Sequence, residues 1–114
     1  MSLFNSLFGK KESSGIITKV SAEVFKTLIQ ERNVQLVDVR SKAEYESGHI
    51  KGAYNIDFFK QGAFKSSFEK FDKTKPIYVY CRSGHRSGQS AKQLNHIGFQ
   101  EIYDLKGGYM AWKP

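Results

Sequence analysis

Apolar residues along the chain fall into short runs that are typical of buried strands and into stripes at helical spacing. Residues 34–39 and 77–80 are almost continuously apolar, the composition of strands that are covered on both faces. Residues 16–19, 53–56 and 101–104 are further candidate strands. Because helical stripes separate these runs, the pattern predicts an α/β fold with a mainly parallel sheet. We expect residues 34–39 at the centre of that sheet.

The first helix is predicted to begin at Ser21, whose hydroxyl can accept a hydrogen bond from a free amide of the first turn. Its expected buried stripe consists of Val24, Phe25, Leu28 and Ile29. Ser41 and Glu44 have the spacing of a capping box, so a short helix is predicted after Arg40 and before Gly48. Two later stripes also recur at helical spacing, namely Phe64, Phe68 and Phe71, and then Ala91, Leu94 and Ile97.

The length of 114 residues suits one compact domain. Residues 1–15 end in a polar run and are interpreted as a flexible extension, and residues 16–114 as the domain. The extension carries a short apolar stripe whose role the sequence leaves open, formed by Leu3, Phe4, Leu7 and Phe8.

The chain carries a formal net charge of +7. A positive field favours small anionic partners. The lysines are scattered, so a nucleic-acid partner is not expected. No apolar run approaches the length of a membrane span or of a secretory signal core, so we expect neither a transmembrane segment nor secretion.

Cys81 is the only cysteine of the chain. An internal disulfide and a multi-cysteine metal site are therefore excluded, and a reducing compartment, the cytoplasm, is expected. No metal and no cofactor are predicted.

The residues with the clearest chemical potential directly follow the strand at residues 77–80. The segment reads Cys-Arg-Ser-Gly-His-Arg-Ser and precedes a helical stripe, so its amides and the positive end of the helix dipole can form an anion-binding nest. A helix terminus alone supplies only about 0.3 to 1 kcal/mol toward stabilising a thiolate. Loop amides and arginines must supply the rest, with Cys81 expected at the solvent-open rim. The predicted anion-binding loop comprises Arg82, Ser83, Gly84, His85, Arg86 and Ser87.

This loop resembles the active-site loop of the rhodanese family of sulfurtransferases. Two flanking segments strengthen the resemblance: residues 36–40 with 48–56, and residues 105–108 with Trp112. One departure is Asp57, where many members have a proline close by.

The resemblance implies a five-stranded parallel sheet with helices on both faces, and Cys81 as the nucleophile that becomes a persulfide. The implied partners are a small anionic sulfur donor such as thiosulfate, and a small-molecule or protein thiol acceptor. Asp38 and Arg40 are expected to support the site, and Glu44 and His49 to be purely structural. The oligomeric state stays open.

Three alternatives remain. A cysteine phosphatase or arsenate reductase is disfavoured because four residues separate Cys81 from Arg86, whereas phosphate-binding cysteine loops generally carry one more. A non-catalytic rhodanese-like interaction module is disfavoured because Cys81 is retained. A persulfide relay between proteins cannot be separated from a small-molecule enzyme by sequence.

Overall fold

A computed structural model describes residues 15–113 of the chain. Its centre is a five-stranded sheet in which every neighbouring pair of strands is parallel, in the order β1-β5-β4-β2-β3. The strands are β1 (Ile16–Val20), β2 (Gln35–Asp38), β3 (Tyr54–Asn55), β4 (Ile77–Tyr80) and β5 (Glu101–Leu105). The carboxyl ends of parallel strands meet at one edge of a sheet, and this edge receives the loops that follow β2, β4 and β5.

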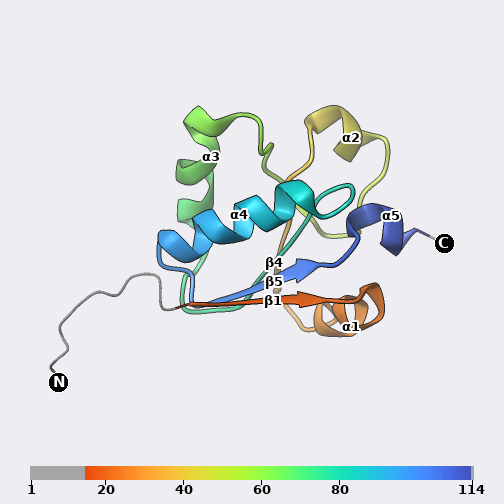
Figure 1. The fold of residues 1–114 in the computed structure, drawn as a ribbon, viewed down its shortest axis with the longest axis horizontal. Coiled ribbons are helices and arrows are strands. Elements are labelled where there is room, and N and C mark those ends of the chain that lie inside the picture. The colour runs from red at the N-terminus through yellow and green to blue at the C-terminus, as the bar shows by residue number, and fades with distance from the viewer. Residues whose placement is uncertain (1–14, 114) are drawn as a thin grey trace, which may run out of the picture.

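Helices cover both faces of the sheet, as Figure 1 shows. They are α1 (Ala22–Leu28), α2 (Lys42–Glu46), α3 (Gln61–Ser67), the 3-10 turn η1 (Phe68–Lys70), α4 (His85–His96) and α5 (Gly108–Trp112). In Figure 1, α3 and α4 lie on one side of the strands and α1 lies on the other. The predicted α/β architecture is therefore confirmed.

Two apolar clusters occupy the two faces. The cluster beneath α3 and α4 includes Val37, Val79, Phe64, Phe68 and Leu94. The cluster on the α1 face includes Leu36, Tyr78, Phe25 and Leu105. Successive residues of β2 and β4 point into opposite clusters, because side chains alternate along a strand. This explains why both strands are apolar throughout.

The predicted centre of the sheet was wrong. β4, and not the strand at residues 34–39, is the middle strand, and β2 lies between β4 and β3. Both strands are buried on two faces, so their compositions are alike. Composition therefore does not tell which of the two is the middle strand. The order depends on crossovers that the local pattern does not record.

The predicted helix starts agree with the structure. Ser21 Oγ accepts a hydrogen bond from the Val24 amide at 3.2 Å. Ser41 and Glu44 form the reciprocal capping box. The predicted apolar stripe of α1 was partly wrong, since Val24 is 46% exposed while Phe25 is fully buried. In α1 the hydrophobic contact with the sheet is narrower than the stripe, because the helix is only seven residues long.

The predicted N-terminal extension and its stripe of Leu3, Phe4, Leu7 and Phe8 lie outside the described residues. Within residues 15–113, no helix combines the length and the apolar character that crossing a bilayer requires.

Candidate active site

The predicted loop lies at the carboxyl end of β4. Cys81 follows the last residue of the strand, and α4 begins at His85. Between them, Gly84 adopts a left-handed conformation with φ of 111° and caps the helix. A residue with a Cβ is strained there, so the glycine allows the chain to reverse tightly around the sulfur.

The Cys81 side chain points into its own loop. Its Sγ accepts a hydrogen bond from the Gly84 amide at 3.0 Å. Among the described residues this is the one backbone amide that donates to the sulfur. The expected solvent-open position was wrong, because Cys81 is only 1% exposed and packs into the core cluster beneath α4. The side chain is buried in the same cluster as Val37 of β2 and Ala91 and Leu94 of α4.

Backbone hydrogen bonds join the start of α5 to the loop. The amides of Tyr109 and Met110 donate to the carbonyls of Cys81 at 2.7 Å and of Arg82 at 3.0 Å. Gly108 makes this contact possible, since a Cβ at that position would lie 2.6 Å from both carbonyl oxygens. The Gly107-Gly108 pair therefore fixes the backbone on which Cys81 sits.

Arg86 binds a carboxylate instead of pointing freely into the loop. Its Nη1 and Nη2 donate to the two Glu44 carboxylate oxygens at 2.8 and 3.0 Å. This hydrogen bond is the main reason that the pKa of Glu44 is lowered to about 2. It also raises the pKa of Arg86, to which the nearby Cys81 adds a smaller contribution. The Arg86 guanidinium also lies 5.4 Å from the centre of the exposed Phe59 ring.

The structural role of Glu44 extends beyond its own helix. Glu44 caps α2 and also anchors Arg86, which is 42 residues away in sequence. By contrast, His49 stacks on Tyr45 with ring centres 3.7 Å apart, and its Nδ1 lies 2.9 Å from the Tyr45 carbonyl oxygen. Those contacts are local to α2 and the turn that follows it.

Asp38 and Arg40 form a buried pair beside the loop. Arg40 Nε and Nη2 lie 3.0 and 2.7 Å from the Asp38 Oδ2 oxygen, and Arg40 Nη2 also donates to the Gly48 carbonyl at 2.6 Å. The guanidinium lies 4.4 Å from the centre of the Tyr109 ring in α5. The pair thus connects the end of β2 with α5, on which the loop backbone rests.

The remaining loop residues divide into exposed and buried ones. Arg82, Ser83 and His85 are exposed, and Gly84 is half-buried. Ser87 is fully buried, and its hydroxyl donates to Asp104 Oδ1 at 2.5 Å. The Ser87 hydroxyl therefore faces β5, and the membership of Ser87 in the anion-binding loop stays a prediction. Burial raises the pKa of Asp104, and the Ser87 hydrogen bond partly offsets this.

No group of three or more histidine, cysteine, aspartate or glutamate side chains within residues 15–113 is arranged to hold a metal ion. The site consists of one sulfur, one amide contact and paired arginines.

Comparison with known proteins identifies the family of this fold and loop. Residues 21–114 match the family model of the rhodanese-like domain. The chain belongs to the rhodanese-like domain family. This confirms the resemblance that the three sequence segments indicate.

Several relatives and solved structures are similar to this rhodanese-like chain. The uncharacterized protein YqhL of Bacillus subtilis is 41% identical over 95 residues, which cover 78% of this chain and 73% of that protein. The thiosulfate sulfurtransferase GlpE of Coxiella burnetii is 38% identical over 86 residues, covering 75% and 78%. The human single-domain sulfurtransferase TSTD1 superposes with a TM-score of 0.70 at 27% identity, covering 82% and 93%. These similarities support a sulfurtransferase-type role.

Sequence reasoning did not place two carboxylates, Glu44 and Asp104, beside the rhodanese-like loop. Glu44 is visible only as a capping residue, and Asp104 only as a polar position in a strand. An acidic residue inside an otherwise buried strand is the one available signal for Asp104, since buried carboxylates need partners.

Proposed function

We propose that this protein is a rhodanese-type sulfurtransferase in which Cys81 carries the transferred sulfur as a persulfide. The Cys81 thiolate attacks the outer sulfur of thiosulfate, the sulfur–sulfur bond of thiosulfate breaks, and its electron pair leaves with sulfite. A thiophilic acceptor, such as cyanide or a thiol, then takes the outer sulfur of the persulfide and returns Cys81 as the thiolate.

The observation that carries this proposal is the contact between the Gly84 amide and Cys81 Sγ at 3.0 Å. An amide that donates to Sγ at the start of α4 stabilises the negative sulfur of the thiolate, the form of Cys81 that attacks the donor. The Arg86 guanidinium is close enough to Cys81 for the two groups to interact electrostatically, and the exposed Arg82 can meet an incoming anion.

Because Cys81 is 1% exposed, sulfur transfer requires the loop to admit the donor. Ser83 and His85 are exposed, so an incoming donor meets the loop on the side that these two residues form. The acceptor that matches this site must present a narrow nucleophile. A bare thiolate or cyanide meets that requirement, whether it is a free molecule or belongs to a protein.

The test is intact mass measurement after incubation with thiosulfate in the absence of reductant. We expect one added sulfur on the wild type and none on Cys81→Ala. Sulfite in place of thiosulfate is the matched control and should add no sulfur. A wild type that gains no sulfur while its circular dichroism shows a folded protein would contradict the proposal.

The burial of Cys81 favours a second candidate, a non-catalytic rhodanese-like interaction module. In that case the thiol is part of the core cluster with Val37 and Val79. The same experiment separates the two functions when combined with iodoacetamide, since Cys81 is the only thiol. An enzyme is alkylated at Cys81 under native conditions, whereas a core cysteine reacts only after unfolding.

A further inference from the structure

A polar hollow of about 590 Å³ lies beside the loop, on the side away from α2. It is formed where α4 crosses β5 and leaves part of the edge strand β1 uncovered. Its lining includes Lys19, Gly84, Gly88, Lys92, Asp104 and Lys106. Cys81 is not among the lining residues, although Ser83, Gly84 and His85 of its loop are, so this hollow adjoins the proposed sulfur site without containing the sulfur. We call it the β1 hollow.

Asp104 at the wall of the β1 hollow has one carboxylate oxygen without a hydrogen bond. The residue is fully buried, and its Oδ1 accepts from Ser87. Within the described part of the chain, Oδ2 has no hydrogen-bond partner. Lys19 Nζ is 3.9 Å from Oδ2, which is beyond hydrogen-bonding distance. A buried polar atom without a hydrogen bond lowers the stability of the folded protein by about 1 to 3 kcal/mol. A ligand that donates a hydrogen bond to Oδ2 would therefore be favoured.

Three lysines and a histidine line the same hollow as this oxygen. Lys19, Lys92 and Lys106 come from β1, α4 and the turn after β5, and His85 is the first residue of α4. Considering residues 15–113, neither Lys92 nor Lys106 forms an ion pair. The first turn of the twelve-residue α4 also lines the hollow and adds the positive end of its dipole. The charges therefore favour an anion.

These two requirements define the ligand. A fully deprotonated anion such as sulfate would place a bare oxygen against Asp104 Oδ2 and be repelled. A ligand with an ammonium group would meet Lys19 near the same oxygen. The ligand must therefore be an anion that carries an uncharged O–H or N–H donor.

We propose that the β1 hollow is a binding site for hydrogen phosphate. Its P–OH group donates to Asp104 Oδ2, and its other oxygens accept from Lys92 and Lys106. Phosphate monoesters lose their last proton near pH 6. Inorganic phosphate still carries one O–H group at neutral pH, so it meets the requirement and a monoester does not.

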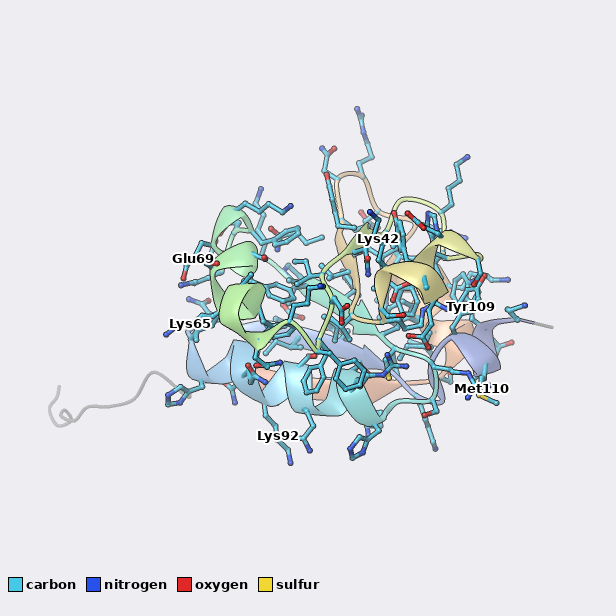
Figure 2. All side chains as sticks on the ribbon, turned by 90° about the horizontal axis from the view of Figure 1, so that it is seen from above. Lys42, Lys65, Glu69, Lys92, Tyr109 and Met110 are labelled. Carbon is cyan, nitrogen blue, oxygen red and sulfur yellow. The ribbon has the colours of Figure 1, made fainter. Side chains whose placement is uncertain are left out.

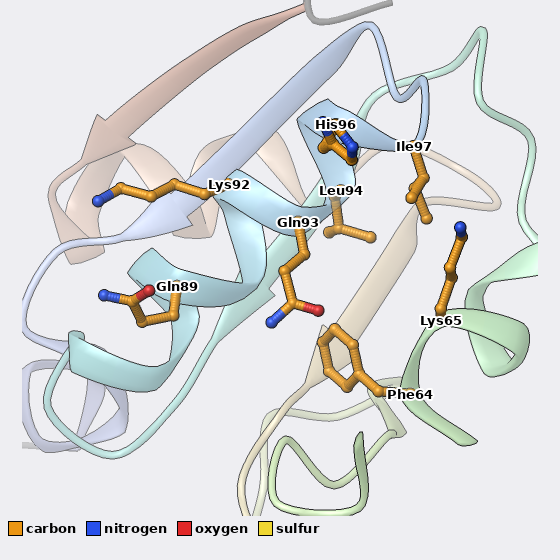
Figure 3. A pocket seen from close by; sticks show the side chains of 8 residues that line it. All are labelled: Phe64, Lys65, Gln89, Lys92, Gln93, Leu94, His96 and Ile97. Atoms are coloured by element: carbon orange, nitrogen blue, oxygen red, sulfur yellow. The ribbon is translucent and has the colours of Figure 1, made fainter. Parts of the chain in front are cut away.

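A second hollow of about 310 Å³ lies between α3 and α4, and it does not share these features (Figure 3). Its wall includes Phe64, Leu94 and Ile97. Lys92 contributes to both hollows, but in Figure 3 its ammonium group points away from Phe64 and Lys65. The charge of Lys92 therefore serves the β1 hollow.

The test is an amide NMR titration of the full chain with inorganic phosphate and, at matched ionic strength, with sulfate. We expect phosphate to cause saturable shifts at Gly84, Gly88 and Gly107, with sulfate about tenfold weaker, as for the loss of one charge-assisted hydrogen bond. Methyl phosphate at pH 7.5 should behave like sulfate. Equal binding of phosphate and sulfate by the wild type, or no saturable shift with either, would overturn the proposal.

Substitutions test which residues give the β1 hollow its preference for phosphate over sulfate. Asp104→Asn supplies an amide donor in place of the carboxylate, so sulfate should bind as well as phosphate. Lys92→Gln should weaken phosphate binding several-fold, whereas Lys42→Gln should not change it. Lys42 and Lys92 lie on opposite sides of the molecule when it is seen from above (Figure 2). Retained selectivity in Asp104→Asn would contradict the role of this carboxylate.

A second substitution keeps the test available if Asp104→Asn does not fold. A Cβ at Gly88 would lie 3.8 Å from Asp104 Oδ2, and one at Gly62 in α3 has no heavy atom within 4 Å. Gly88→Ala should therefore weaken phosphate binding by filling the space next to the carboxylate, and Gly62→Ala should leave it unchanged. The proposed sulfur transfer is read from the mass of Cys81, so either proposal can fail alone.

Discussion

Two carboxylates flank the rhodanese-like loop, and their surroundings are opposite. Glu44, on the α2 side, binds both of its oxygens to Arg86, and its pKa is lowered to about 2. Asp104, on the β1 side, is fully buried with one oxygen unpartnered, and burial raises its pKa. The same chemical group is thus held as an anion on one side and is disfavoured as an anion on the other.

The difference separates a structural role from a binding role. On the α2 side, the pairs Asp38–Arg40 and Glu44–Arg86 satisfy each other's charges and fix the loop. On the β1 side, Lys92 and Lys106 have no ion pair within the described residues, and Asp104 Oδ2 has no hydrogen bond and only a long ion pair, at 3.9 Å, with Lys19. The paired side stabilises the site, and the unpaired side retains the capacity to bind a ligand.

The largest expected effect comes from breaking the paired side at Asp38. Asp38→Asn leaves the Arg40 guanidinium buried without a counter-charge, which should cost about 3 kcal/mol in the free energy of unfolding measured in urea. Glu46→Gln is the control, because its pair with Lys42 is long, at 4.0 Å, and both side chains are largely exposed. It should change stability by less than about 0.5 kcal/mol. Similar losses in the two variants would show that burial does not distinguish these pairs.

An intermediate effect is expected from Arg86→Ala. The loss of a guanidinium beside Cys81 should lower kcat/KM for thiosulfate by about 10- to 100-fold, the range for a charge-assisted hydrogen bond. A neutral persulfide donor should lose less, since it carries no charge for Arg86 to bind. Lys65→Ala, a substitution on α3, is the matched loss of one positive charge and should change neither. If both donors lose equally with Arg86→Ala, this residue serves only to hold Glu44.

The smallest effect contrasts the two carboxylates directly. The pKa of Glu44 is lower in the folded state, so its contribution is present above about pH 4.5 and is lost as the pH falls toward about 2. Because the side chain is partly exposed, we expect a contribution of only about 1 kcal/mol, and Glu44→Gln should remove it.

Asp104 should show the opposite sign. Its pKa is higher in the folded state, so the folded protein loses stability as the pH rises from about 3.8 through that raised value. Unfolding free energies between pH 3 and pH 7 test both residues. Relative to the wild type, Asp104→Asn should gain stability as the pH rises, and Glu44→Gln should lose it. Changes of the same sign would show that the two sides are electrostatically alike.

Local features were predictable because they depend on neighbours in sequence. The capping box of Ser41 and Glu44 and the glycine-containing turn after β4 require only residues a few positions apart. The two-sided burial of β2 and β4 follows from their composition. The family resemblance used the same local segments, and so it located Cys81 correctly at the end of β4.

Contacts across the fold were not predictable in this way. Nothing local links Glu44 to Arg86, Ser87 to Asp104, or the Gly84 amide to a buried sulfur. The expected exposure of Cys81 failed for the same reason, since loop composition indicates polarity but not how tightly α4 and β2 close over one side chain.

The sequence by itself determined the α/β class, the strand that leads to Cys81 and the basic, glycine-containing composition of the loop, because these depend on periodicity and on residues close together in sequence. Only the tertiary structure decided which charges are neutralised. The free energy of a charged side chain depends on burial and on partners brought together by chain folding, and the strand order that sets those partners is absent from any local pattern.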